Sequence, residues 1–168
     1  MALHGEVGPR ESSIKAIAER AGVERLTVYR HFPDQAALFE ACTGHWQTLN
    51  PPPDPSLWQS VSEPHARANV LLEALYGYFA RTATMWRLAY RDRDDVPGMS
   101  APMRRVDNYL ERLASDLVKG RHGEKCHVTA RHLVQFGTWE SLDAQGLKPA
   151  EMAGIGCRWL DAVSSPGL

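Results

Sequence analysis

The chain has 168 residues, of which 43% are hydrophobic and 23% are charged, and its formal net charge at pH 7 is −1. These values are typical of one ordinary globular domain, or of a small module joined to a larger one, and they exclude a disordered chain and a protein coated in positive charge. A nucleic-acid-binding function must therefore rest on a local pattern.

The cysteines and the absence of targeting patterns indicate a cytoplasmic protein. Cys42, Cys126 and Cys157 are widely spaced and form no CxxC arrangement, which is typical of reduced thiols in the cytosol. The N-terminus lacks a basic start followed by an apolar run, and no segment approaches the roughly 18 apolar residues of a membrane span. We therefore expect no membrane association.

Apolar residues recur at the helical period along nearly the whole chain, which predicts an all-α fold. The first periodic segment runs from Ile14 to Ala21, with Ser12 or Ser13 as the cap and Gly22 as its end. A short second helix follows, and Pro33 ends it.

Three apolar residues, Val23, Val28 and Phe32, are expected to anchor this second helix in the core. Asp34 is well placed to cap a third helix that reaches Leu49. Successive prolines then predict a loop over 50–56. The remaining chain predicts a largely buried helix over 63–84, a short continuation over 85–91, a loop over 92–102, and helices over 103–117, 128–142 and 149–163.

A helix, a turn that contains glycine and a second short helix are the layout of a DNA-binding helix-turn-helix. The anchoring residues leave a polar set free to meet a groove and its phosphates, since hydroxyls can donate to phosphate oxygens and arginine can reach phosphates or guanine edges. This set is Arg25, Thr27, Tyr29, Arg30 and His31.

The stretch IAERAGVERLTVYRHFPDQAALF, over 17–39, resembles the N-terminal signature of the TetR family of bacterial transcriptional regulators. The matching positions are Ile17, Ala18, Ala21, Gly22, Val23, Thr27, Val28, Tyr29, His31, Phe32, Asp34 and Leu38. The resemblance implies an N-terminal helix-turn-helix domain over 1–47 and a helical domain for ligand binding and dimerisation over 48–168. It also implies a transcriptional repressor that leaves its DNA operator when a small apolar or aromatic effector binds.

The sequence departs from the family pattern at three places. Glu24 stands where a small polar residue is usual, and Gln35 stands where a lysine is usual. The family's first helix is expected to be truncated here, since only its last turn fits before Gly8. The first 50 residues carry a net charge of −1, so we expect a modest electrostatic attraction to DNA.

The resemblance assigns three sets of site residues. The DNA-binding set is Ser13, Lys15, Arg25, Thr27, Tyr29, Arg30 and His31. The ligand-binding set, each member of which also fits plain core packing, is Tyr76, Phe79, Trp86, Tyr90, Met103, Phe136 and Trp139. The homodimer set, chosen because small residues on the last helix permit close helix packing, is Val134, Leu142, Ile155, Gly156, Trp159 and Val163.

No pattern indicates catalysis, a cofactor or a metal site. The chain has no nucleophile elbow and no phosphate-binding glycine loop, so we do not expect an enzyme. His122 and Cys126 are four residues apart, but no second half of a metal site is evident. An alternative to the regulator is a dimeric helical protein that binds a ligand or a partner and has lost productive DNA binding.

Overall fold

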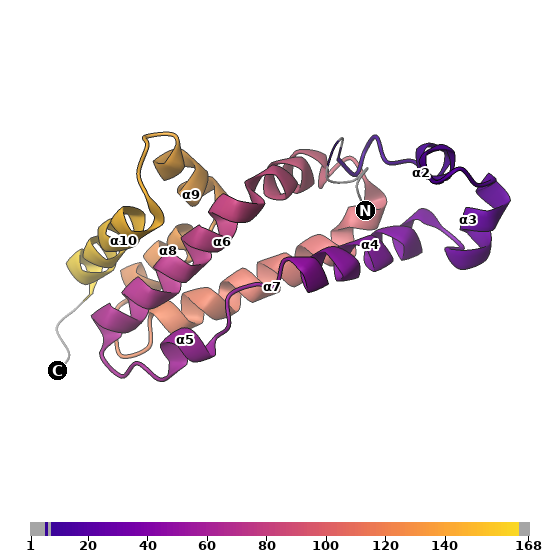
Figure 1. The fold of residues 1–168 in the computed structure, drawn as a ribbon. Coiled ribbons are helices and arrows are strands. Elements are labelled where there is room, and N and C mark those ends of the chain that lie inside the picture. The colour runs from indigo at the N-terminus through magenta and orange to yellow at the C-terminus, as the bar shows by residue number, and fades with distance from the viewer. Residues whose placement is uncertain (1–5, 7, 165–168) are drawn as a thin grey trace. The chain divides into compact units, whose positions relative to one another are not determined.

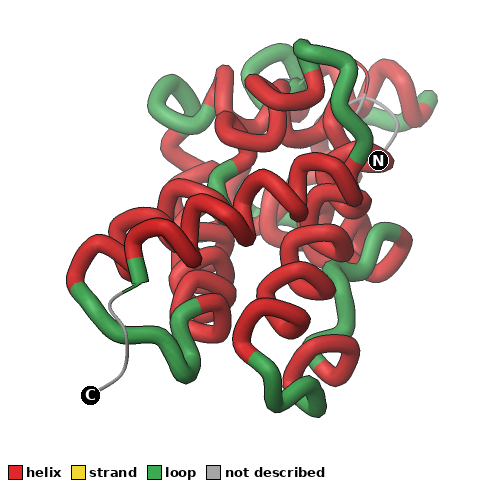
Figure 2. Tube along the Cα trace, turned by 90° about the vertical axis from the view of Figure 1, so that its left-hand side faces the viewer, coloured by secondary structure: helices red, strands yellow, loops and turns green. Residues whose placement is uncertain are grey.

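The computed structural model describes residue 6 and residues 8–164, and every regular element among them is helical. The predicted all-α fold is therefore confirmed, and Figure 2 shows the described chain as helices and loops. Two compact units can be distinguished, each built from two stretches of sequence. Unit 1 comprises Met1–Pro51 and Thr82–Val106, and unit 2 comprises Pro52–Arg81 and Asp107–Leu168. The domain boundary expected between residues 47 and 48 stays a prediction.

Two short helices near the start of unit 1, α2 (Ile14–Ala21) and α3 (Arg25–His31), form the predicted helix-turn-helix (Figure 1). Ser13 is the N-cap of α2, because its Oγ accepts a hydrogen bond from Ala16 N at 3.2 Å. Gly22 ends α2 in the left-handed conformation at φ 66°, which a glycine adopts without steric cost. The turn between the helices is thus built from local sequence signals.

Helix α4 (Gln35–Leu49) begins at Asp34, whose carboxylate accepts a hydrogen bond from Ala37 N at 2.8 Å. Its Phe39 is buried in a cluster with residues of the short 3₁₀ helix η1 (Pro97–Met99) and of α7 (Ser100–Leu117). This cluster consists of Phe39, Val96, Met99 and Met103, with Ala89, Tyr90 and Val106 packed against it. The region over 97–102, predicted as a loop, therefore contains η1 and the first residues of α7.

Helix α6 is a single helix over Pro64–Asp92, which unites the helix predicted over 63–84 with the short continuation predicted over 85–91. The Glu63 carboxylate accepts hydrogen bonds from the backbone N of His65 and Ala66, at 2.8 and 2.5 Å, at the start of this helix. These bonds satisfy N–H groups that have no partner inside the helix.

In unit 2, the short helix α5 (Ser56–Gln59) was not predicted. Its Trp58 is 1% exposed, and the indole Nε1 donates to Asp116 Oδ2 at 2.9 Å. This hydrogen bond links a residue of the proline-rich region to α7 within unit 2.

The helix predicted over 128–142 is two helices, α8 (Glu124–Leu133) and α9 (Phe136–Asp143). The last carbonyl oxygens of α8 accept hydrogen bonds from side chains outside the helix. Thr138 Oγ1 donates to His132 O at 2.6 Å, and Tyr76 Oη donates to Leu133 O at 2.9 Å. The last helix, α10 (Pro149–Val163), lies where the sequence predicted it. None of the described helices combines the length and apolar character needed to cross a membrane.

Candidate nucleic-acid interface

The two DNA-binding candidates at the start of α2 have different surroundings. Ser13 is exposed, and its hydroxyl caps the helix as described above. Lys15 is exposed as well, and its Nζ lies 3.8 Å from Glu19 Oε1 one helical turn later. An exposed pair at this distance is weak, so Lys15 can exchange Glu19 for a phosphate at small cost.

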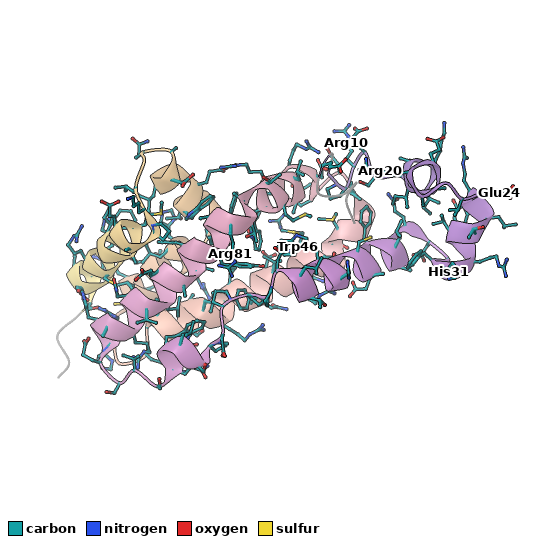
Figure 3. The ribbon with its side chains drawn as sticks, viewed as in Figure 1. Arg10, Arg20, Glu24, His31, Trp46 and Arg81 are labelled. Atoms are coloured by element: carbon teal, nitrogen blue, oxygen red, sulfur yellow. The ribbon has the colours of Figure 1, made fainter. Side chains whose placement is uncertain are left out.

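The five candidates on α3, namely Arg25, Thr27, Tyr29, Arg30 and His31, are all exposed. Val28 is 7% exposed and attaches the helix to unit 1, while Tyr29 is 49% exposed and presents its ring to solvent. Figure 3 shows α3 with Glu24 at its start and His31 at its end. The structure therefore brings these five side chains together on one exposed helix, as the predicted DNA contact requires.

Two apolar residues, one in the turn and one on α3, are exposed. Val23, expected to anchor α3 in the core, is 41% exposed, and Leu26 is 68% exposed. The anchoring role falls to Val28 and to Phe32, which is half-buried. The assignment of Val23 to the core was wrong, since Val23 lies in the exposed turn between α2 and α3 and not on a packed helix face.

Leu26 is a candidate DNA contact that the sequence did not single out. It precedes Tyr29 and Arg30 by three and four residues, which places the three side chains on one side of α3. An apolar side chain on a groove-reading helix can contact the methyl group of thymine. The helical spacing to Tyr29 and Arg30 is the signal that could have found it.

The charge around this interface is mixed. Arg20 Nη2 is paired with Glu6 Oε1 at 2.6 Å, and both side chains are about half exposed. Glu24 is the N-cap residue of α3, but its side chain makes no capping hydrogen bond. A carboxylate at this position lies next to cationic side chains and opposes the approach of phosphate.

Four of the ligand-binding candidates, Tyr76, Phe79, Phe136 and Trp139, belong to unit 2, and the rings of the last three pack together. The centroids of the Phe79 and Phe136 rings are 5.4 Å apart, and the Trp139 ring is 6.1 Å from Phe79 and 5.1 Å from Phe136. Tyr76 is fully buried, and this burial raises the pKa of its hydroxyl. Trp139 is 1% exposed, and its Nε1 has no hydrogen-bond partner among the described residues.

The other three candidates, Trp86, Tyr90 and Met103, belong to unit 1. The Trp86 and Tyr90 rings are stacked with centroids 6.0 Å apart, and Trp86 Nε1 donates to Thr82 Oγ1 at 3.0 Å. Met103 belongs to the Phe39 cluster. The ligand-binding set thus comprises two packed groups, each within its own unit.

The dimer candidates divide into exposed and internal residues. Trp159 is 41% exposed, and Leu142, Ile155 and Val163 are partly exposed, so all four are available to a partner. Val134 is 1% exposed and Gly156 is buried within unit 2.

A Cβ atom at Gly156 would lie 2.8 Å from Leu72 Cδ1 and 3.1 Å from Leu133 Cδ2. The close approach inferred for Gly156 therefore occurs inside the protomer. Val128, which is 64% exposed on α8, is an apolar surface residue that the sequence analysis did not single out.

No group of three or more His, Cys, Asp or Glu side chains that could hold a metal ion occurs among the described residues. Cys126 is buried, and its Sγ donates to the backbone oxygen of His122 at 3.3 Å. Burial raises the pKa of the Cys157 thiol to about 11, which keeps this group protonated at neutral pH.

Comparisons with known proteins agree with this geometry. Residues 1–42 match the family described as bacterial regulatory proteins, tetR family. No curated protein is similar enough in sequence to match the chain.

Among solved structures, a Clostridium perfringens protein provisionally assigned as a fatty acid metabolism regulator is 14% identical with a TM-score of 0.70, and the match covers 98% of this chain and 96% of the other. A transcriptional regulator from Rhodococcus sp. Rha1 is 16% identical with a TM-score of 0.65, over 99% and 94% of the two chains. At these identities the structural likeness establishes the fold, and the family match covers the helix-turn-helix. Residues 1–42 thus match the tetR family of bacterial regulatory proteins, and the whole chain shares its fold with solved structures of transcriptional regulators.

Proposed function

We propose that this regulator is a repressor that binds operator DNA as a homodimer and leaves it when a small apolar molecule binds. The observation that carries the ligand part is the ring cluster of Phe79, Phe136 and Trp139, which contains a buried indole N–H without an acceptor among the described residues. A buried donor left unpaired costs about 1–3 kcal/mol, which an acceptor on a ligand would recover. The effector we expect has an apolar or aromatic body and one hydrogen-bond acceptor.

For DNA binding, we propose that α3 of each protomer enters the major groove. The exposed Arg25 and Arg30 side chains support base or phosphate contacts, and the Tyr29 hydroxyl supports a phosphate contact. Ser13 and Lys15 at the start of α2 would contact the neighbouring backbone. Residues 1–47 would then form the DNA-binding domain, and residues 48–168 the ligand-binding and dimerisation domain.

For the homodimer, we propose an interface on α8 and α10 that includes the exposed Trp159 and the partly exposed Ile155. A two-fold interface buries the same surface on both protomers, so one exposed tryptophan contributes twice. Val128 extends this apolar surface onto α8.

The decisive experiment measures DNA binding and ligand response on one protein. Duplexes that the protein selects from a random-sequence pool would be titrated at several salt concentrations, and apolar compounds would be screened by melting temperature and tryptophan fluorescence. We expect a compound that raises the melting temperature to release the selected duplex. A dimer that binds compounds but selects no duplex would instead support the alternative, a ligand-binding protein without productive DNA binding.

A further inference from the structure

Asp92, the last residue of α6, carries a carboxylate that is 1% exposed. Arg91 Nε donates to its Oδ1 at 2.6 Å, and Arg91 Nη2 donates to its Oδ2 at 2.9 Å. The backbone N of Arg10 also donates to Oδ2, at 3.0 Å. A buried carboxylate is stable only when such donors surround it, and the hydrogen bond from Arg91 holds the pKa of Asp92 below its ordinary value.

The segment over 8–12 is shaped around this carboxylate. Gly8 has φ +90°, and a Cβ atom there would lie 2.7 Å from Asp92 Oδ2. Ser12 is fully buried, and its Oγ donates to Gly8 O at 2.7 Å, which closes the segment into a compact turn. An exposed ion pair between Arg10 Nη1 and Asp95 Oδ2, at 3.2 Å, adds a second contact to the same region of unit 1.

This segment leads directly into the helix-turn-helix. Ser12, which is held by Gly8, is followed by Ser13, the N-cap of α2. The buried turn is thus directly followed by the N-cap of α2. The turn that is hydrogen-bonded to Asp92 is therefore continuous with the start of α2.

A second attachment lies after α3 in the sequence. Phe39 of α4 packs against η1 so closely that a Cβ atom at Gly98 would lie 2.6 Å from Phe39 Cδ2. Arg105 Nη2 of α7 is also paired with Glu40 Oε2 of α4, at 2.9 Å. Residues 82–106 thus hold the chain both before α2 and after α3, within unit 1.

We propose that Asp92 is a positioning residue for DNA binding, which fixes the turn before α2 and so sets the orientation in which α3 is presented. The proposal rests on DNA binding through α3 and requires no effector. Asp92 makes no contact with DNA in this scheme, and it acts through the backbone of Arg10. We call the hydrogen bonds of Asp92 with Arg91 and with the backbone of Arg10 the clamp. Loss of the clamp leaves the exposed cations of α2 and α3 in place. Non-specific attraction to phosphate therefore persists, while the fit to one DNA sequence is lost.

The test compares Asp92→Asn with Asp94→Asn, a control in which the replaced carboxylate is 91% exposed. Each variant would be titrated with a duplex selected by the wild-type protein and with a scrambled duplex, and hydrogen exchange would be followed over residues 9–31. We expect Asp92→Asn to weaken binding to the selected duplex about tenfold or more, because a charge-assisted hydrogen bond is lost. We expect binding to the scrambled duplex to change less than about twofold, and exchange to accelerate over residues 9–21.

Gly8→Ala provides an independent variant, because it disturbs the same turn without changing any charge. It should reproduce the selective loss seen for Asp92→Asn, while Asp94→Asn should bind as the wild type does. Wild-type affinity for the selected duplex in Asp92→Asn would overturn the proposal, as would an equal loss on both duplexes. If the wild-type protein selects no duplex, DNA binding itself fails, and that outcome is distinct from a failure of the clamp.

Discussion

The side chain of Leu72 on α6 fills the space next to Gly156 on α10, so that a Cβ atom at Gly156 would lie only 2.8 Å from Leu72 Cδ1. We predict that Gly156→Ala destabilises the protein by about 1–3 kcal/mol, because overpacking forces well-packed side chains apart. Gly154→Ala is the matched control, since the nearest atom to its added Cβ is Arg158 Nη1 at 3.7 Å.

Urea unfolding of the two variants measures the difference. Gly154→Ala should stabilise the protein by up to about 1 kcal/mol, since alanine favours a helix over glycine. Equal stability of the two variants would contradict the packing described for Gly156.

The exposed surface of α10 gives a prediction about assembly. Trp159→Lys should give monomers at micromolar concentration, because a large apolar side chain is replaced by a charge at the proposed homodimer interface. Leu57→Lys is the control, since Leu57 is a similarly exposed apolar residue on α5. Light scattering checks both variants, and a monomeric wild-type protein would refute the interface.

A substitution of Glu24 is predicted to increase the affinity for DNA. Glu24→Ser should tighten DNA binding, because it removes a carboxylate from the start of α3 and supplies a hydroxyl that can cap the helix. The new cap should stabilise α3 by about 1 kcal/mol. Glu19→Ser, which removes an exposed carboxylate from α2 without creating a cap, separates the two contributions in fluorescence anisotropy titrations.

Two buried tryptophans differ in whether their N–H is paired. Trp58 Nε1 donates to Asp116, whereas Trp139 Nε1 has no partner among the described residues, and both side chains are 1% exposed. Replacing either by phenylalanine removes similar volume, but only Trp58→Phe also breaks a hydrogen bond to a charged group. We therefore expect Trp58→Phe to cost about 1.5–3 kcal/mol more than Trp139→Phe in chemical unfolding.

The same pair reports on the proposed effector. A compound whose acceptor binds the Trp139 N–H should raise the melting temperature of Trp139→Phe less than that of the wild-type protein. Its effect on Trp58→Phe should be retained. A compound that stabilises all three proteins equally would place its acceptor elsewhere.

The features predicted correctly from sequence are those with local causes. Gly22 and Asp34 act through their own backbone conformation or their own side chain, so their effect on α2 and α4 is visible in a few residues of sequence. The exposed cations of α3 follow from the same local pattern.

The features that could not be predicted depend on residues far apart in the chain. The break between α8 and α9 is stabilised by Tyr76, 57 residues from Leu133. Gly156 faces Leu72 and not a second protomer, which no periodicity on α10 reveals. The clamp joins Arg10 and Asp92, which are 82 residues apart, and neither residue belongs to a recognisable sequence motif.

The conformation of Gly8 has a genetic consequence. Every glycine codon begins with two guanines, and any change at either position replaces glycine by a residue with a side chain or ends translation. At φ +90°, beside the buried carboxylate of Asp92 and the half-exposed guanidinium of Arg91, any of the resulting side chains is strained. If the protein is a repressor and the turn acts as proposed, missense mutations at the first two positions of this one codon would derepress the target genes while every DNA-facing residue stays intact, so a selection for constitutive expression should recover them.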